Sequence, residues 1–242
     1  MRKVGVIGLG HVGSTVAYTL VTKGIADELV LIDTNEAKCT AEFYDLLDSL
    51  GRLDTYTKLS MNDYKALQDA DVVITAFGDI KALADGGNRF LEYSFNCQQA
   101  KQVGTALKEA GFHGVLINIS NPCDVITGLL QHYTGLSRQQ VFGTGTFLDT
   151  ARMQRAVSMS LDQNPHNIAG YVLGEHGESQ FAAWSTITVQ DEPITEIAKD
   201  QHLELSELDK AARGGGWLVF NGKKYTCYAI ATCAAKLLQA VF

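Results

Sequence analysis

The sequence predicts an α/β fold in which a doubly wound parallel sheet occupies the N-terminal half. Apolar runs over residues 4–7 and 29–32 read as strands, and residues 12–20 between them carry apolar side chains at helical spacing. Two more apolar runs, 71–77 and 114–120, are expected to be buried strands, each preceded by a helical segment. Strands that alternate with helices in this way pair in parallel, so helices should cover both faces of the sheet.

A glycine-rich turn follows the first expected strand. Its three glycines have the spacing G-x-G-x-x-G and lead into the helical segment. In such a turn the first glycine allows a tight bend, the second lets the backbone approach a pyrophosphate, and the third lets the helix pack closely on the strand. The phosphates then bind the N–H groups at the start of the helix. The turn therefore predicts a dinucleotide site with these cofactor-binding residues: Gly8, Gly10, His11, Val12 and Gly13.

Asp33 is expected to distinguish between the two nicotinamide dinucleotides. It ends the second strand, twenty residues after Gly13, where a carboxylate can accept hydrogen bonds from ribose hydroxyls. The same charge would repel a 2′-phosphate, so NAD is expected rather than NADP. Alternatively, the glycines form a turn of some other α/β protein and Asp33 caps the next helix. A signal peptide is not expected, because the glycines interrupt the apolar segment and no small-x-small cleavage site follows it.

The composition limits the kinds of partner. The chain has 242 residues, 46% of them hydrophobic and 19% charged, with a formal net charge of −7. This charge argues against a nucleic-acid-binding or membrane-surface protein, since no basic stripe could neutralise phosphates. No apolar run is long enough to span a bilayer. The five cysteines are scattered without metal-binding spacing, which predicts free thiols in a reducing cytoplasm and no metal site.

Two polar residues are expected beyond the carboxyl ends of the strands, where parallel sheets bind ligands. Asn121 follows strand 114–120, either as a ligand-binding side chain or as the cap of the following helix. Arg89 opens the helix expected over 90–110, where a positive charge is unfavourable to the helix dipole. We therefore favour a functional role for Arg89 over that of a solvated charge. The loop 78–88 before it is expected to act as a lid.

The C-terminal half contains a carboxylate, a guanidinium and an imidazole that are candidates for a functional site. Asp149 and Arg152 lie three residues apart in the helix expected over 148–161, hence on one face. The alternative for them is an ordinary surface ion pair. His176 stands in a Gly-Glu-His-Gly loop, and we favour a catalytic role over that of a plain surface loop. Histidine side chains in general, with an unperturbed pKa of about 6.5, suit proton exchange at neutral pH.

The chain resembles the L-lactate/malate dehydrogenase family in four segments: the glycine turn 8–13, Ser120-Asn121-Pro122, residues 143–152 and Gly174-Glu175-His176-Gly177. The similarity extends over essentially the whole chain, and within the family the chain resembles the L-2-hydroxyisocaproate dehydrogenases. The resemblance implies NAD-dependent hydride transfer between nicotinamide and a 2-oxo or 2-hydroxy carboxylic acid. It also implies an NAD-binding Rossmann domain over 1–145 and an incomplete α+β substrate domain over 146–242.

The resemblance implies a catalytic role for three residues. His176 matches the family's proton donor and acceptor, and Asp149 matches the carboxylate that orients this histidine. Arg89 matches the loop arginine that polarises the reacting carbonyl. These roles are chemically coherent, because a carboxylate stabilises an imidazolium and an arginine stabilises a developing negative oxygen.

Three more residues match substrate-binding positions of the family. Arg152 matches the arginine whose planar fork binds the substrate carboxylate. Asn121 matches an asparagine near nicotinamide and substrate, and Thr226 matches a threonine in the pocket wall. Relatives set specificity on the loop before the arginine, where this chain has Lys-Ala-Leu-Ala-Asp over 81–85. Its apolar residues predict a 2-hydroxyisocaproate-like substrate with an aliphatic side chain, and lactate and malate are the alternatives.

The C-terminal residues predict a chain break, a final helix and an incomplete domain. The glycines at 214–216 are expected to break the chain before a final helix over 228–241. Relatives continue beyond the position of Phe242, which predicts a fragment or a shortened protein that self-associates through exposed apolar surface. A truncated, inactive NAD-binding protein is the alternative from another functional class. By analogy with the family, we expect a cytoplasmic homo-oligomer, either a dimer or a tetramer.

Overall fold

The computed structural model describes residues 1–79 and 89–242. For residues 89–91 it describes the backbone alone. Residues 80–88 lie outside the described residues, and with them most of the predicted lid and the predicted specificity segment 81–85.

Contacts divide the chain into two compact units, which we describe one at a time. Unit 1 comprises residues 1–144 and 230–242, and unit 2 comprises residues 145–229. The division into domains 1–145 and 146–242 stays a prediction.

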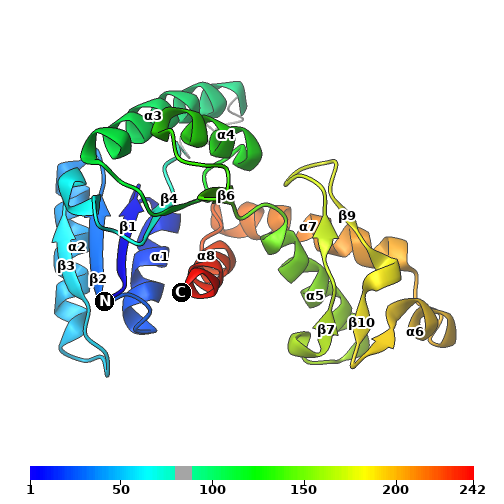
Figure 1. The fold of residues 1–242 in the computed structure, drawn as a ribbon. Coiled ribbons are helices and arrows are strands. Elements are labelled where there is room, and N and C mark those ends of the chain that lie inside the picture. Colours follow the sequence, from blue (N-terminus) through cyan, green and yellow to red (C-terminus); the bar gives the residue numbers. More distant parts are fainter. Residues whose placement is uncertain (80–88) are drawn as a thin grey trace. The chain divides into compact units, whose positions relative to one another are not determined.

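A six-stranded parallel sheet forms the centre of unit 1 and confirms the predicted doubly wound α/β fold (Figure 1). Its strand order is β3-β2-β1-β4-β5-β6, so the order reverses between β1 and β4. Ligands of such sheets bind at this reversal, outside the carboxyl ends of the strands. The strands are β1 (Lys3–Ile7), β2 (Glu28–Ile32), β3 (Lys58–Met61), β4 (Val72–Thr75), β5 (Val115–Asn118) and β6 (Val141–Gly143).

The helices of unit 1 cover both faces of this sheet. Figure 1 shows α3 and α4 on one face and α1 and α8 on the other. None of the helices in the described ranges is long and apolar enough to cross a membrane. The helices are α1 (His11–Thr22), α2 (Glu36–Leu50), the short 3-10 helix η1 (Tyr64–Leu67), α3 (Arg89–Ala110), α4 (Cys123–Thr134) and α8 (Tyr228–Val241).

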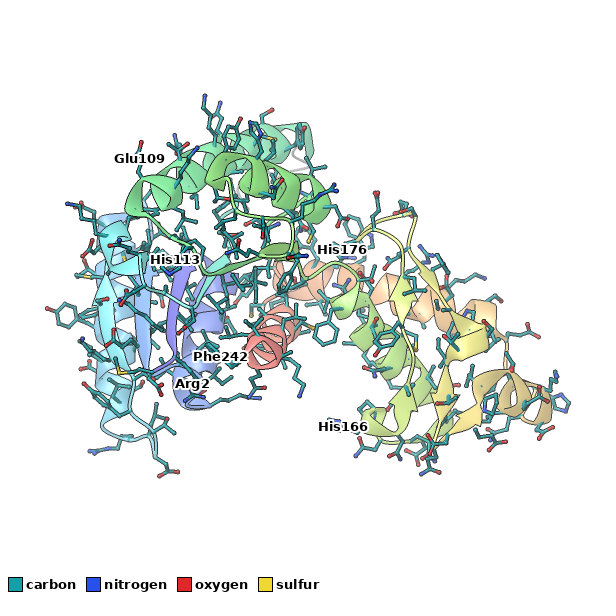
Figure 2. The ribbon with its side chains drawn as sticks, viewed as in Figure 1. Arg2, Glu109, His113, His166, His176 and Phe242 are labelled. Carbon is teal, nitrogen blue, oxygen red and sulfur yellow. The ribbon has the colours of Figure 1, made fainter. Side chains whose placement is uncertain are left out.

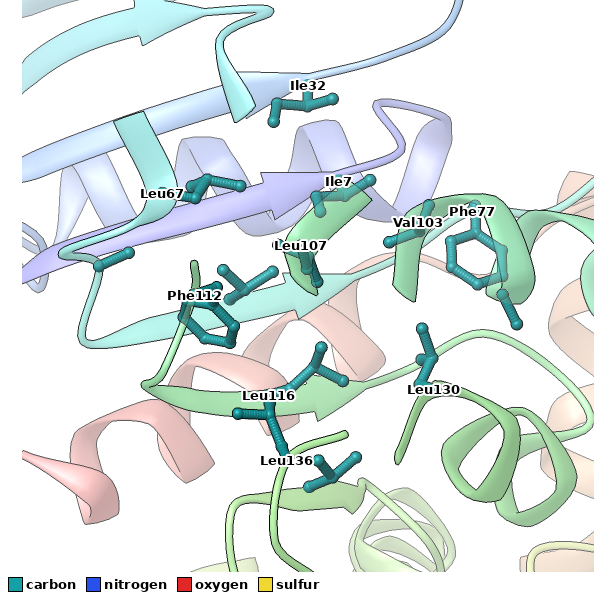
Figure 3. Packing of buried hydrophobic residues seen from close by; sticks show 14 of the residues in the cluster. Ile7, Ile32, Leu67, Phe77, Val103, Leu107, Phe112, Leu116, Leu130 and Leu136 are labelled. Atoms are coloured by element: carbon teal, nitrogen blue, oxygen red, sulfur yellow. The ribbon is translucent and has the colours of Figure 1, made fainter. Parts of the chain in front are cut away.

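One apolar core fixes α3 and α4 to the sheet (Figure 3). Ile7 and Leu116 project from the strands, Leu107 comes from α3, and Leu130 comes from α4; all four are at most 3% exposed. Burying a side chain of this size contributes about 1.5–3 kcal/mol. The core therefore holds the carboxyl ends of β1, β4 and β5 in fixed positions, where the ligand-binding residues are expected.

The last helix packs with the N-terminal part of the chain. The face of α8 that contains Ile230, Ala231 and Leu238 is buried, and small alanines let this helix approach closely. At its end, the Arg2 guanidinium lies 6.0 Å from the centroid of the Phe242 ring (Figure 2). Unit 1 therefore contains both termini of the described chain.

Unit 2 is an α+β arrangement built on α5. A three-stranded antiparallel sheet and a two-stranded hairpin pack with α5 and α7 around a second apolar core, which includes Met153, Val157 and Ile187. Its elements are α5 (Phe147–Leu161), η4 (Pro165–Asn167), β7 (Ile168–Ala169), β8 (Val172–Leu173), β9 (Phe181–Ala182), η5 (Trp184–Thr186), β10 (Thr188–Val189), β11 (Glu192–Pro193), α6 (Ile194–Asp200) and α7 (Leu205–Lys223).

The predicted chain break at residues 214–216 is wrong, because the three glycines lie inside α7. Two of them face arginines of α5. A Cβ atom on Gly215 would lie 2.7 Å from Nη2 of Arg155, and one on Gly216 would lie 3.0 Å from Nη2 of Arg152. Packing of α7 against α5 therefore outweighs the low helix propensity of glycine here.

Candidate active site

The glycine turn has the geometry that its spacing predicts. Gly8 has a φ of +92°, and a Cβ atom on it would lie 2.7 Å from the backbone nitrogen of Phe77. A Cβ atom on Gly13 would lie 1.7 Å from the carbonyl oxygen of Gly8, so only glycine lets α1 pack this closely on β1. Around the Cβ position of Gly10, by contrast, no described atom lies within 4 Å. The middle glycine thus leaves the backbone accessible from outside.

The start of α1 suits an anion. Gly10 is the N-cap and supplies no side chain to the first turn, and that turn, which includes His11 and Val12, contains no acidic residue. The N–H groups of a first helical turn have no partner within the helix and carry partial positive charge. A pyrophosphate is the kind of group that such a turn binds.

Asp33 lies directly beside this turn. Its Oδ2 accepts a hydrogen bond from the backbone N–H of Leu9 at 2.6 Å, and its Oδ1 accepts one from Asn35 at 2.8 Å. The side chain that caps α2 is that of Asn35, which accepts from the N–H of Lys38, and not that of Asp33. A carboxylate has about four acceptor positions, so Asp33 can also accept from ribose hydroxyls. The residues in unit 1 therefore fit a bound NAD.

Tyr64 is a neighbour of Asp33 that was not among the predicted site residues. Burial, which is the larger cause, and the negative charge of Asp33 together raise the pKa of its phenol to about 12. Tyr64 therefore remains neutral and presents an aromatic surface beside the carboxylate. The signal available in the sequence was its position on η1, between two strands of the dinucleotide-binding half.

Asn121 is exposed after the carboxyl end of β5. The N-cap of α4 is Pro122, and no side chain caps that helix, so the alternative role of Asn121 as a cap is not observed. A buried residue of α3, Asn96, donates a hydrogen bond to the carbonyl oxygen of Asn121 at 2.7 Å. Among the described residues, Oδ1 of Asn96 has no partner although it is buried. Asn96 therefore holds the backbone of Asn121 in place. It was not among the residues predicted from the sequence.

In unit 2, one buried carboxylate accepts hydrogen bonds from a guanidinium and an imidazole. Oδ1 of Asp149 accepts from Nη1 of Arg152 at 3.0 Å, and Oδ2 accepts from Nδ1 of His176 at 2.5 Å. The side chain of Asp149 is 5% exposed, against 20% for Arg152 and 26% for His176. This differs from the surface ion pair that was the alternative. Because Oδ2 is an acceptor, Nδ1 of His176 carries the proton of this bond.

Local hydrogen bonds explain why a loop 27 residues away meets Asp149. Thr146 donates through Oγ1 to the carbonyl of Val172 at 2.7 Å, and the N–H of Val172 donates to Oγ1 of Thr150 at 3.0 Å. These bonds tie β8 to the start of α5. Gly174, with a φ of +95°, then turns the chain so that His176 faces Asp149.

Two of the predicted site residues, Arg89 and Thr226, have no described contact with the cluster of Asp149, Arg152 and His176. Arg89 is the first residue of α3, and its side chain lies outside the described part of the chain. Thr226 is half-buried in the segment between α7 and α8 and belongs to unit 2. The structure thus joins Asp149, Arg152 and His176 in unit 2. Among the residues described, no group of three or more histidines, cysteines or acids could hold a metal ion.

Comparison with known proteins identifies two matching family models. Residues 2–143 match the NAD-binding domain of lactate/malate dehydrogenases, and residues 146–242 match their α/β C-terminal domain. Among curated relatives, L-lactate dehydrogenase 3 of Bacillus anthracis is 36% identical, with 100% of this chain and 77% of that protein covered. L-lactate dehydrogenase 2 of Lactococcus lactis subsp. lactis is 34% identical, with 99% of this chain and 77% of the relative covered.

Solved structures agree with this result. The minor L-lactate dehydrogenase of Enterococcus mundtii, in its ligand-bound form, matches with a TM-score of 0.93 and 34% identity over 99% of this chain and 77% of that one. A lactate dehydrogenase from a Medee basin deep-sea metagenome matches with a TM-score of 0.92 and 32% identity over 99% and 78% of the two chains. The chain therefore belongs to the lactate/malate dehydrogenase family and is an NAD-dependent oxidoreductase that acts on a CH–OH group.

Proposed function

We propose that this protein is an L-2-hydroxyacid dehydrogenase that reversibly reduces a 2-oxo acid with an aliphatic side chain. The observation that carries the proposal is the Asp149 carboxylate, which accepts hydrogen bonds from both Arg152 and His176. A 2-oxo acid offers a carboxylate for a guanidinium and a carbonyl oxygen for a proton donor. The guanidinium and the imidazole on one buried carboxylate therefore suit both ends of such a substrate.

The cofactor would be held by the glycine turn and by Asp33. The N–H groups at the start of α1 would bind the pyrophosphate, and Asp33 would accept from the adenosine ribose. When bound, NADH supplies the hydride that reduces the carbonyl carbon. In the reverse direction, the same residues hold NAD. Asn121, exposed at the end of β5, is expected to contact nicotinamide and substrate.

His176 is proposed to move the proton. Its Nδ1–H is directed to Asp149, so Nε2 is the nitrogen to which we assign proton donation to the forming alkoxide. Asp149 would stabilise the imidazolium and keep the ring in one orientation. During oxidation of the hydroxy acid, Nε2 takes the proton back from the hydroxyl group.

Arg152 is proposed to hold the substrate carboxylate. A guanidinium binds a carboxylate through two parallel N–H donors, which fixes the orientation of the reacting carbonyl. Arg152 is itself held by Asp149 at 3.0 Å, and its side chain is 20% exposed. We expect Arg89 to stabilise the negative charge that develops on the carbonyl oxygen, and Thr226 to form part of the pocket wall.

Two features support a substrate with an aliphatic side chain. The segment 81–85 offers alanines and a leucine, and Gly216 places no side chain against the Arg152 guanidinium. A second candidate is L-lactate dehydrogenase, which is favoured by the names of the relatives. Pyruvate has a methyl group where 2-oxoisocaproate has an isobutyl group, so the two candidates differ in the space that the pocket provides.

Steady-state oxidation of NADH tests both candidates. The ratio of kcat/KM for 2-oxoisocaproate, pyruvate and oxaloacetate distinguishes an aliphatic from a lactate or malate specificity. Replacing His176 by asparagine is expected to remove turnover with each acid while NADH still binds. His166→Asn is the matched control, because this exposed histidine of unit 2 lies far from His176 (Figure 2). Full turnover by His176→Asn would refute the assignment.

We also propose that the protein works as a homo-oligomer, a dimer or a tetramer, in the cytoplasm. None of the five cysteines, all of which lie in the described ranges, forms a disulfide, which suits a reducing compartment. Several large apolar side chains of α7, among them Leu218 at 73% exposed, lie on the surface of unit 2 and could contact another subunit. Light scattering with size-exclusion chromatography tests the oligomeric state, and a monomer at working concentration would exclude it.

A further inference from the structure

Arg213 joins α7 to the loop that carries His176. Its Nε donates to Oδ2 of Asp209 at 2.7 Å, one turn earlier on the same helix. Nη1 donates to the carbonyl oxygen of Glu178 at 3.4 Å, and Nη2 donates to the carbonyl oxygen of Gln180. One guanidinium therefore binds two backbone carbonyls that follow the histidine by two and four residues.

The loop itself is a tight turn with few bonds of its own. A Cβ atom on Gly174 would lie 2.9 Å from the carbonyl oxygen of Ser179, so the two arms of the loop approach closely at its base. The N–H of Gln180 donates to the carbonyl of Gly177 at a long 3.3 Å. The side chain of His176 is bound at Nδ1 by Asp149. The carbonyl groups that Arg213 binds thus lie on the returning arm of the loop, directly after the histidine.

The same guanidinium borders a cavity behind the carboxylate of Asp149. This cavity has a volume of about 10 Å³, and Gln180, Asp209 and Arg213 line it together with Asp149. Oε1 of Gln180 is buried and has no hydrogen-bond partner within the described ranges. Val172 and Ala212 complete the lining of the cavity.

We propose that Arg213 is a positioning residue, which holds the returning arm of the loop on α7 and thereby keeps His176 against Asp149. This inference rests on the proposed function of His176. A planar guanidinium with five N–H donors can bind Asp209 and two carbonyls at once. Lysine cannot replace this set of contacts, since an ammonium lacks the planar fork, and methionine cannot, since its thioether has no N–H donor. The position of the imidazole is therefore set by α7 through Arg213.

The test compares Arg213→Met with Arg155→Met in the whole 242-residue chain. Arg155 is a matched control, because its Nη2 also donates to a backbone carbonyl of α7, that of Ala211 at 2.9 Å, but it does not touch the loop. For Arg213→Met we expect kcat for 2-oxo acid reduction to fall about 10- to 100-fold, as for a small displacement of a reacting group. The KM for NADH should not change. Arg155→Met should keep the wild-type kcat.

A spectroscopic measurement separates positioning from a general loss of structure. The proton on Nδ1 of His176 is hydrogen-bonded to a carboxylate and should give a downfield proton NMR resonance, assigned by its absence in His176→Asn. We expect Arg213→Met to lose this resonance and Arg155→Met to retain it. Asp209→Asn, which keeps the guanidinium but loosens it, should show a smaller loss of kcat and a weakened resonance. If Arg213→Met does not fold, the kcat and the resonance of Asp209→Asn test the proposal instead.

An unchanged resonance in Arg213→Met would overturn the inference, whether or not kcat falls. A wild-type kcat in both Arg213→Met and Asp209→Asn would overturn it as well. A wild-type chain that turns over none of the three 2-oxo acids would contradict the proposed function instead. In that case the resonance still reports whether Arg213 holds the histidine in place.

Discussion

Replacing Asp149 by asparagine perturbs the centre of the proposed catalytic cluster. The carboxylate accepts hydrogen bonds from Arg152 and His176 at 3.0 Å and 2.5 Å, and only 5% of its side chain is exposed. Asparagine has the same shape, but only one of its two terminal atoms accepts hydrogen bonds. The amide N–H₂ group must therefore face one of the two donors. The variant loses one hydrogen bond and leaves a mostly buried guanidinium without its anion.

The magnitude follows from the charges involved. A hydrogen bond to a charged group contributes about 1.5–3 kcal/mol, so losing one and weakening the other should lower the free energy of unfolding by about 2–4 kcal/mol. For a chain of this size each kcal/mol lowers the thermal midpoint by about 2–4 °C. An amide in place of the carboxylate that orients a catalytic histidine costs about 10⁴-fold in kcat, because the wrong tautomer is held. We expect a loss of this order.

Two assays check these values. Thermal unfolding followed by circular dichroism gives the change in midpoint, and NADH oxidation with saturating 2-oxo acid gives kcat. The control is Glu196→Gln, which removes an exposed ion pair with Lys199 in the same unit, where the side chains are 57% and 71% exposed. This control should leave both quantities unchanged. If Asp149→Asn kept kcat within tenfold of the wild type and unfolded at the same temperature, the reasoning would be wrong.

Two further predictions concern unit 1. Gly13→Ala would place a Cβ atom 1.7 Å from the carbonyl oxygen of Gly8, so α1 must move away from β1. Calorimetry should therefore show a loss of NADH affinity. An unchanged affinity would contradict the close packing. The pKa of Tyr64 is raised from 10.0 to about 12, first by burial and then by Asp33, so the folded state favours the neutral phenol. The stabilisation that this raised pKa provides is complete below pH 10.0 and is lost as the pH rises through about 12. In alkaline denaturation, the stability of Tyr64→Phe should therefore fall less steeply with pH over this range than that of the wild type.

The N-terminal fold could be predicted because its signals are local. The strands β1 and β2 are short apolar runs bounded by polar or glycine residues, and the predicted ranges 4–7 and 29–32 agree with them to within one residue. The first glycine turn was equally clear, since Gly8 and Gly13 are required by backbone contacts within a few residues of the turn or with the adjacent strand.

Unit 2 was harder to predict because distant contacts decide its local structure. Residues 168–173 are mostly apolar and have the length of one strand, but Gly170, with a φ of +108°, divides them into β7 and β8. A Cβ atom on Gly170 would lie 2.6 Å from Ile187, a contact that no local pattern reveals. The helical glycines of α7 are a similar case, because arginines of α5 require them.

The candidate site was predictable in its charged residues and not in those that support them. Asp149 and Arg152 share a helix face, and His176 stands in a glycine loop, so their spacing was informative. Asn96 has no such signal, because a buried amide in a long helix resembles any surface asparagine. Arg213 resembles half of an ordinary i,i+4 ion pair with Asp209, and its contact with the loop becomes evident only when α7 is folded.

The central claim is that a bound 2-oxo acid is reduced at the imidazole that Asp149 holds. The most direct measurement is a single turnover, in which the protein saturated with NADH is mixed rapidly with 2-oxoisocaproate or pyruvate and the loss of NADH is followed. We predict one equivalent of NADH oxidised per site by the wild type and none by His176→Asn on the same time scale. NADH that binds to the wild-type protein but is not consumed by either acid would contradict the claim and leave an NAD-binding protein without this catalysis.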